Sequence, residues 1–237
     1  MRCPLPSTTG PVTRNISSLL NGIRMLLTYS FLVVFLMLPA SAAETPGPTE
    51  KVITLVAFGD SLTAGYGLRQ DEAFPVVLEK ALRERGHRVE IINAGVSGDT
   101  AQAGMERVDW SVPDGVDGVI LELGANDMLR GIDPTITKAN LEAVIDRMES
   151  RGIPVMLAGM VAAPNLGQAY ADKFNIIYPE LAKKYSLILY PFFIDGTAGQ
   201  RSLNLPDGMH PTGEGVKIIV ERILPSVEAF IARISKR

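Results

Sequence analysis

From Val52 onward, the sequence alternates between two patterns of apolar and polar residues. Short apolar, β-branched runs predict buried strands, and longer segments with apolar residues three or four positions apart predict amphipathic helices. Strands are expected at residues 52–57, 88–93, 116–123, 153–159 and 187–190. Helices are expected after residue 100, after Asp133 and at residues 71–85, 168–185 and 212–235. This alternation predicts an α/β fold, a three-layer α/β/α sandwich with a mostly parallel five-stranded sheet.

Two residues in this pattern bear on where helices begin and end. Asp133 precedes Pro134 and is expected to cap the helix that begins there, because a short acidic side chain can accept the first free N–H groups. Pro225 falls inside the last predicted helix, where it lacks an N–H and its ring crowds the preceding turn. We expect Pro225 to kink or break that helix.

Four unusual loops lie at the same edge of the predicted sheet. They cover residues 59–67, 94–100, 124–131 and 204–211. Open parallel sheets bind ligands beyond the carboxyl ends of their strands. The sequence therefore predicts one functional site at this edge.

The first 42 residues have the three parts of a secretory signal peptide. Three arginines and no acidic residue give a positive leading region, Met25–Leu38 is apolar, and Ala40-Ser41-Ala42 offers a cleavage site. The competing interpretation is an uncleaved anchor, but a spanning helix needs about 20 apolar residues, more than this run supplies. We expect a signal peptide at residues 1–42, a flexible lead-in at 43–51 and one domain at 52–237. The protein would be exported, periplasmic or secreted, without stable membrane insertion after cleavage.

Composition narrows the classes of partner. With 237 residues, 46% of them hydrophobic, the chain can form one sizeable core. Removing residues 1–42 changes the net charge from −3 to −6, because three arginines and no acidic residue are lost. A negative domain argues against a nucleic-acid partner. The single cysteine, Cys3, lies in the removed part, so the domain has no disulfide and no thiol nucleophile. The sequence indicates no particular oligomeric state.

Cofactor and metal sites are not indicated either. No GxGxxG or GxxxxGK fingerprint follows a predicted strand. Two distant histidines without a cysteine do not provide clustered metal ligands, and Asp99, Asp127 and Asp207 are only a weak case for a hard cation. We therefore expect no cofactor and no metal.

Ser61 is the candidate nucleophile, since it stands where the first predicted strand must turn. A serine hydroxyl is weak until a histidine takes its proton, and that histidine works best beside a carboxylate. His87 is expected at the amino end of the sheet as a surface turn residue, which leaves His210. Asp207, three residues earlier, can reach a ring nitrogen of His210, although it could instead only cap a turn. Asp60 is expected to bond local backbone, because neighbouring residues at a strand end point apart.

Acyl transfer also needs hydrogen-bond donors for the developing negative oxygen, and one such donor is worth about 2.7–4 kcal/mol in well-studied enzymes. Three candidates lie at the same predicted edge: the backbone N–H groups of Ser61 and Gly98 and the side-chain amide of Asn126. Taken singly, Gly98 could supply a tight turn and Asn126 could cap the next segment. Because all three are predicted near Ser61 and His210, we interpret them together as an oxyanion hole.

A serine hydrolase of the usual α/β type is not indicated, because the GxSxG elbow is absent. Instead, the segments GDSLTAGYG, NAGVSGDT, LGANDMLRG and DGMHP follow one another in this order. They resemble the sequence blocks of the SGNH, or GDSL, hydrolase family, and most of all its branch of thioesterase I, lysophospholipase L1 and arylesterase. The resemblance covers essentially all of residues 52–230.

The resemblance implies the flavodoxin-like SGNH hydrolase fold. It also implies that Ser61 is the nucleophile, that Asp207 and His210 complete the triad, and that Ser61, Gly98 and Asn126 form the oxyanion hole. Two residues depart from the pattern of that branch. Ala125 stands where a second glycine is common, and Met128 is bulkier than the expected small residue. Both departures concern the shape of the acyl pocket rather than the type of reaction.

We therefore expect a serine hydrolase that cleaves carboxylic esters, either aryl esters or esters of short to medium acyl chains. Acyl thioesters and lysophospholipids are expected as further substrates. Its partner would be a small-molecule or lipid ester, and its activity should fall on acidification as the histidine becomes charged. One alternative is a carbohydrate-ester deacetylase of the same fold. The only tryptophan, Trp110, gives that reading little support, since it is expected in the core or a lid. Another alternative is a catalytically silent binding module, which would predict a missing triad member.

Overall fold

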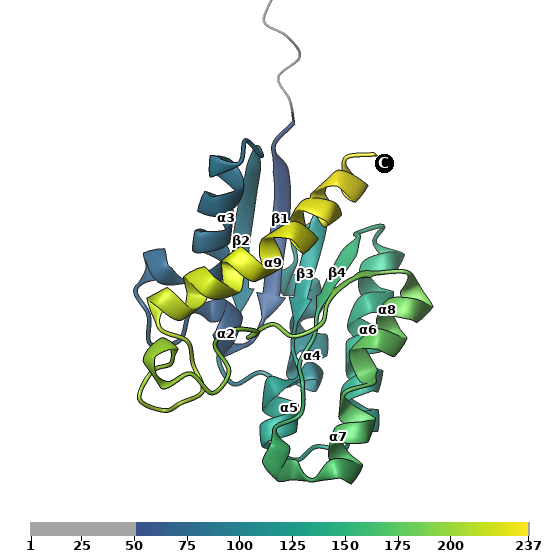
Figure 1. Cartoon of the computed structure of the whole chain (residues 1–237). Helices are drawn as coiled ribbons and strands as arrows, with labels where there is room; N and C mark the ends of the chain where they lie inside the picture. Colours follow the sequence, from purple (N-terminus) through teal and green to yellow (C-terminus); the bar gives the residue numbers. More distant parts are fainter. Residues whose placement is uncertain (1–50, 237) are drawn as a thin grey trace, which may run out of the picture. The chain divides into compact units, whose positions relative to one another are not determined.

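The computed structural model describes residues 51–236. The predicted signal peptide and all but the last residue of the predicted lead-in lie outside the described residues. Five strands form one sheet in the order β2-β1-β3-β4-β5, and every neighbouring pair is parallel (Figure 1). The strands are β1 (Ile53–Gly59), β2 (Val89–Gly95), β3 (Gly118–Glu122), β4 (Val155–Ala158) and β5 (Ile188–Tyr190).

Helices cover both faces of this sheet. α3 (Phe74–Glu84) and α9 (Gly213–Ile234) pack together on one face, and α4 (Ala101–Ser111), α6 (Pro134–Ser150) and α8 (Ile177–Tyr185) cover the other (Figure 1). The remaining helices, all short, are α2 (Ser61–Ala64), α5 (Ala125–Leu129) and α7 (Gln168–Phe174). Three 3-10 turns are η1 (Gln70–Glu72), η2 (Pro164–Leu166) and η3 (Arg201–Leu203). The predicted three-layer α/β/α sandwich is confirmed.

The strand order places a topological switch point beside β1. The chain passes from β1 to β2 on one side and later to β3 on the other, so the loops that follow β1 and β3 diverge at the carboxyl edge. Such a switch point is where open α/β sheets bind ligands. Ser61 directly follows β1 and Asn126 follows β3, which brings two segments far apart in sequence to this edge.

The buried strands supply most of the core, because a parallel sheet covered on both faces excludes water from both. All five residues of β3 are buried, and so are all four of β4. The apolar side of α9 packs against this core through Val216, Ile219, Val220, Ile223, Val227 and Phe230.

Two helix predictions differ from the structure. The helix predicted at 168–185 is two helices, α7 and α8, that are separated at Asn175 and Ile176. The reason is Pro179, since a proline in an unbroken helix would clash with the carbonyl four residues earlier, at Asn175. Pro225 does not break α9, which runs from Gly213 to Ile234. Buried residues on both sides of Pro225 hold this helix against the core. Asp133 caps α6 as predicted, with its side chain accepting the Thr135 N–H at 2.9 Å.

Candidate active site

Ser61 begins helix α2 directly after strand β1. Asp60 caps this helix, because its Oδ1 accepts the Leu62 N–H at 2.9 Å. The turn depends on a glycine before it: a Cβ on Gly59 would lie 2.1 Å from Thr63 Oγ1 and 2.5 Å from Glu122 Oε2. Ser61 is therefore presented on a short helix whose approach leaves no room for another side chain.

The hydroxyl of Ser61 meets the side chain of His210, 149 residues later in the sequence. Ser61 Oγ lies 2.9 Å from His210 Nε2. On the other side of the ring, His210 Nδ1 lies 2.7 Å from Asp207 Oδ2. With the ring proton on Nδ1, the imidazole donates to the carboxylate and can accept the serine proton. The structure thus brings Ser61, His210 and Asp207 into one hydrogen-bonded row.

The backbone of its own loop fixes Asp207. The Oδ1 atom accepts the N–H groups of Met209 at 2.8 Å and His210 at 3.0 Å. These two bonds, and then the bond to the His210 ring, lower the pKa of Asp207 to about 2. A carboxylate that stays ionised in this way keeps its orientation toward the imidazole at neutral pH.

The three predicted oxyanion donors differ in their surroundings. Among residues 51–236, the backbone N–H groups of Ser61 and Gly98 have no hydrogen-bond acceptor. Gly98 has a φ of 89°, a conformation that favours glycine. Asn126 Nδ2, in contrast, donates to Asp60 Oδ2 and to the Asp99 carbonyl, both at 3.0 Å. Its amide can reach a substrate oxygen only by sharing or releasing one of these bonds.

An apolar cavity of about 260 Å³ adjoins Ser61. Ser61, Asn126 and His210 line it, whereas Gly98 does not. Its apolar lining is Leu62, Ala125, Met128, Leu129, Met160, Ala163, Ile194 and Met209. Met128 crosses from α5 to the loop after β4, where its sulfur accepts the Ala163 N–H at 3.1 Å. The two residues that depart from the family pattern, Ala125 and Met128, thus both form part of the cavity wall.

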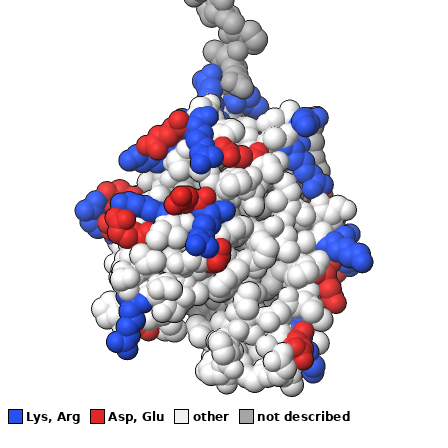
Figure 2. Space-filling model, viewed as in Figure 1, with Lys and Arg blue, Asp and Glu red and all other residues white. Residues whose placement is uncertain are grey.

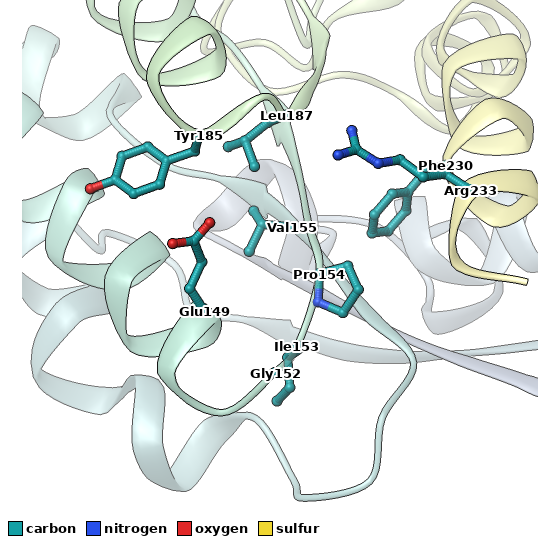
Figure 3. A pocket seen from close by; sticks show the side chains of 9 residues that line it. All are labelled: Glu149, Gly152, Ile153, Pro154, Val155, Tyr185, Leu187, Phe230 and Arg233. Carbon is teal, nitrogen blue, oxygen red and sulfur yellow. The ribbon is translucent and has the colours of Figure 1, made fainter. Parts of the chain in front are cut away.

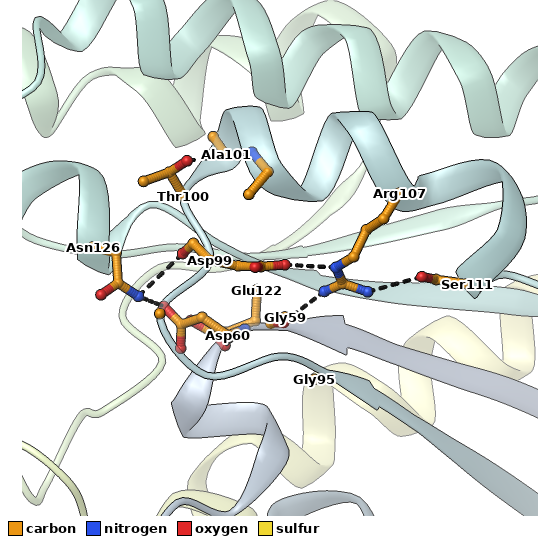
Figure 4. A network of polar contacts seen from close by, with 12 residues as sticks. Gly59, Asp60, Gly95, Asp99, Thr100, Ala101, Arg107, Ser111, Glu122 and Asn126 are labelled. Carbon is orange, nitrogen blue, oxygen red and sulfur yellow. Dashed lines mark hydrogen bonds and ion pairs between the residues drawn. The ribbon is translucent and has the colours of Figure 1, made fainter.

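Sequence reasoning missed a polar network that connects Asp60, Asp99, Arg107 and Asn126 (Figure 4). Glu122, at the end of β3, accepts the Thr63 hydroxyl at 2.8 Å. Arg107 of α4 donates to Asp99, to Ser111 and, at 2.9 Å, to the Gly59 carbonyl. An acid that directly follows the apolar residues of β3, at the end of the strand, was the signal available in the sequence.

Asp60 belongs to the same network. It bonds local backbone as predicted, but it also holds the Asn126 amide, which the sequence did not indicate. Burial raises the pKa of Asp60 to about 6, although the hydrogen bonds from Leu62 and Asn126 act in the opposite direction.

A second cavity of the described residues lacks this combination of groups. Figure 3 shows this cavity, of about 300 Å³, at the amino ends of β4 and β5, where Glu149, Tyr185 and Arg233 contribute to the lining without a serine or a histidine. Trp110 is 76% exposed at the end of α4 and does not line the cavity beside Ser61, so its expected place in the core or a lid is wrong. On the face shown in Figure 2, charged side chains gather over α3 and α9 and are sparse toward the lower edge of the view.

Neither a metal site nor a membrane-spanning helix is found among residues 51–236. Within residues 51–236, no three His, Cys, Asp or Glu side chains are grouped so that they could hold a metal ion. In the same range, no helix combines the length and the apolar character that a bilayer span requires.

Known proteins resemble this chain over most of its length. An arylesterase of Vibrio mimicus is 37% identical over 194 residues, which are 80% of this chain and 92% of that protein. The thioesterase 1/protease 1/lysophospholipase L1 of Escherichia coli (strain K12) is 30% identical over 212 residues, 89% of this chain and 96% of that protein. Among solved structures, AlinE4, an SGNH-hydrolase family esterase, is 44% identical with a TM-score of 0.65, and the match covers 77% of this chain and 98% of that one.

Residues 57–218 match the family model described as the GDSL-like Lipase/Acylhydrolase family. This range contains Ser61 and the loop with His210, and the match agrees with the sequence segments and with the strand order. The chain therefore belongs to the GDSL-like lipase/acylhydrolase family of carboxylic ester hydrolases.

Proposed function

We propose that this protein is a serine esterase that hydrolyses carboxylic esters through an acyl-enzyme on Ser61. The observation that carries the proposal is the row of hydrogen bonds from Asp207 through His210 to Ser61, at the wall of an apolar cavity. A nucleophile, a base, an orienter and a place for an acyl chain are the parts that acyl transfer needs.

In the first half of the proposed reaction, Ser61 Oγ attacks the ester carbonyl while His210 Nε2 takes the hydroxyl proton. The negative charge on the carbonyl oxygen is stabilised by the N–H groups of Ser61 and Gly98 and by the Asn126 amide. His210 then gives its proton to the leaving alcohol, which departs and leaves an ester on Ser61. In the second half, His210 takes a proton from water, the hydroxide attacks the acyl-enzyme, and the acid is released as Ser61 regains its proton.

The substrate we propose is an aryl ester or a short to medium acyl ester, with acyl thioesters and lysophospholipids as further substrates. The lining of the cavity contains one ionised side chain, Asp60, and otherwise suits an uncharged acyl chain. The names of the relatives described above, arylesterase and thioesterase 1/protease 1/lysophospholipase L1, support the same choice.

The test is a panel of p-nitrophenyl esters of increasing acyl length, and of the corresponding thioesters, with Ser61→Ala as the blank. Loss of the serine should lower kcat by about 10⁴-fold or more and leave the melting temperature nearly unchanged. Full activity in Ser61→Ala would overturn the proposal. A silent binding module would show no hydrolysis by the unaltered protein at all.

We also propose that the protein is exported and that residues 1–42 are removed, as their sequence predicts. The N-terminus of protein recovered from the periplasm or the medium tests this. A mature chain that begins near Ala43 supports it, and an intact leader anchored in the membrane contradicts it.

A further inference from the structure

Glu122 is a buried acid for which the proposed reaction has no use. Glu122 is only 1% exposed to solvent. The Oε2 atom accepts the Thr63 hydroxyl at 2.8 Å and the Asp60 N–H at 3.3 Å. The Oε1 atom has no hydrogen-bond partner among the described residues. The absence of a side chain at Gly59 makes room for this carboxyl group, because a Cβ there would lie 2.5 Å from it.

Among residues 51–236, no cationic side chain forms an ion pair with Glu122. Arg107, the cation of this network, donates to Asp99, to Ser111 and to the Gly59 carbonyl instead. The charged group beside Glu122 is the Asp60 carboxylate, itself fully buried. Two like charges in a buried site strongly disfavour each other, so one of the two groups keeps a proton.

The surroundings decide which group keeps it. Burial and then the charge of Asp60 raise the pKa of Glu122 well above its ordinary value. Both oxygens of Asp60 accept a hydrogen bond, from the Leu62 N–H and the Asn126 amide, and these bonds favour its charged form. On Glu122 only Oε2 accepts hydrogen bonds, and Oε1 has no partner among the described residues. The proton therefore resides on Glu122 at neutral pH, and the negative charge resides on Asp60.

The other ionisable groups around Glu122 do not change this assignment. Tyr178 of α8 donates to the Leu123 carbonyl, and burial raises its pKa well above its ordinary value, so it stays neutral. Asp127 of α5 is occupied by the Ala101 N–H and the Thr137 hydroxyl. Neither supplies a positive charge that would stabilise an ionised Glu122.

We propose that Glu122 is a positioning residue that acts as a neutral carboxylic acid and holds Asp60 as the anion that orients the Asn126 amide. The catalytic part of this inference rests on the function proposed above. Asp60 Oδ2 binds Asn126 Nδ2 at 3.0 Å, so a fixed Asp60 fixes the amide before substrate arrives. Donors that are already oriented need no reorganisation when the oxyanion forms.

The first experiment tests the neutral state without any measurement of activity. The unfolded chain loses the Glu122 proton above about pH 4.5, whereas the folded chain keeps it, so folding loses stability as pH rises from that point. Glu122→Gln has no proton to lose. In urea unfolding followed by circular dichroism, the unfolding constant of the unaltered protein relative to Glu122→Gln should increase about tenfold per pH unit above about pH 5.

The matched control is Glu90→Gln, an exposed acid on strand β2. Its unfolding constant relative to the unaltered protein should stay nearly constant over the same range, because water surrounds that side chain in both states. A constant ratio for Glu122→Gln as well would overturn the neutral-acid assignment.

The second experiment tests positioning by steady-state kinetics on a p-nitrophenyl ester. Glu122→Gln keeps the shape and hydrogen-bonding capacity of a neutral acid, so kcat should stay within about threefold and the acid limb of the pH profile should keep its midpoint. Glu122→Leu leaves Asp60 and Thr63 without their partner, and kcat should fall by about 10–100-fold with little change in KM.

A Glu122→Leu variant that folds and retains full kcat would overturn positioning. If Glu122→Leu does not fold, the pH profile of Glu122→Gln provides the test. A shifted midpoint of its acid limb would mean that a negative charge had been removed, and this result would overturn the proposal of a neutral positioning acid. Activity that survives Ser61→Ala would refute the proposed function and leave the stability result standing, so the two failures are distinguishable.

Discussion

A histidine lies beside a carboxylate at both ends of the sheet, and the two pairs differ in what else they contact. At the amino end, His87 Nε2 lies 3.2 Å from Glu228, whose other oxygen binds Arg85 at 3.2 Å. Among residues 51–236, the second ring nitrogen of His87 has no hydrogen-bond partner. At the carboxyl end, His210 uses Nδ1 for its carboxylate and directs Nε2 to Ser61.

The difference shows that a histidine beside a carboxylate is not enough to form a catalytic site. The carboxylate of Asp207 is fixed by two backbone N–H groups, whereas the carboxylate of Glu228 is shared between two side chains at the surface. Only His210 stands between a carboxylate, a hydroxyl and a cavity. Geometry around the pair therefore distinguishes the proposed base from an ordinary surface contact.

The largest expected effect comes from exchanging each histidine for glutamine. His210→Gln should lower kcat by about 10⁴–10⁶-fold, because the hydroxyl of Ser61 then has no base. His87→Gln, the matched control, should change kcat by about twofold or less. Hydrolysis of a p-nitrophenyl ester at saturating substrate measures both, and equal losses in the two variants would contradict the distinction.

The next effect concerns the two carboxylates. Asp207→Asn should lower kcat by about 10²–10⁴-fold, because an amide at this position can hold the wrong tautomer of His210 and does not stabilise its charged form. Glu228→Gln removes only a partly exposed ion pair, so activity should be unchanged and the unfolding free energy should fall by about 1 kcal/mol or less. Kinetics and urea unfolding of both variants check this, and a fully active Asp207→Asn would remove Asp207 from the mechanism.

The smallest effect is the response to pH. On acidification, kcat/KM should fall, because a protonated imidazole cannot act as a base. Asp60, with a pKa of about 6, becomes neutral as pH falls through that value and loosens its hold on Asn126, so the fall should steepen below about pH 6.

Asp207 does not contribute to this fall. Its pKa is lowered to about 2, so the stability it supplies is present above its ordinary pKa of 3.8 and is lost only as pH falls toward 2. The pH–rate profile of His87→Gln should coincide with that of the unaltered protein. A flat profile down to about pH 5 would contradict the role of His210.

Much of this arrangement could be predicted from the sequence. The strand and helix periods predict the sheet, and the chemistry of acyl transfer indicates Ser61, His210 and Asp207 as candidates. A spacing of three residues was enough for Asp207, because one short loop carries both partners.

What could not be predicted depends on contacts between distant segments. Nothing local to Glu122 shows that Gly59 and Thr63 enclose it, since these lie about 60 residues away. The same holds for Asn126, whose amide is held by Asp60. The break between α7 and α8, in contrast, could have been predicted from Pro179. The apolar residues on both sides of the break keep helical spacing, and this spacing alone predicts one continuous helix.

The long separation between Ser61 and His210 has a consequence for the timing of synthesis. The ribosome makes the serine 149 residues before the histidine, and α9, which packs against α3, is made after both. A nascent chain thus carries a nucleophile without a base, and under the proposed mechanism it is inert toward any ester it meets. Under the proposed mechanism, hydrolysis cannot begin before the loop with His210 has been made and has packed beside Ser61, so the appearance of activity reports that the two ends of this sequence separation have come together.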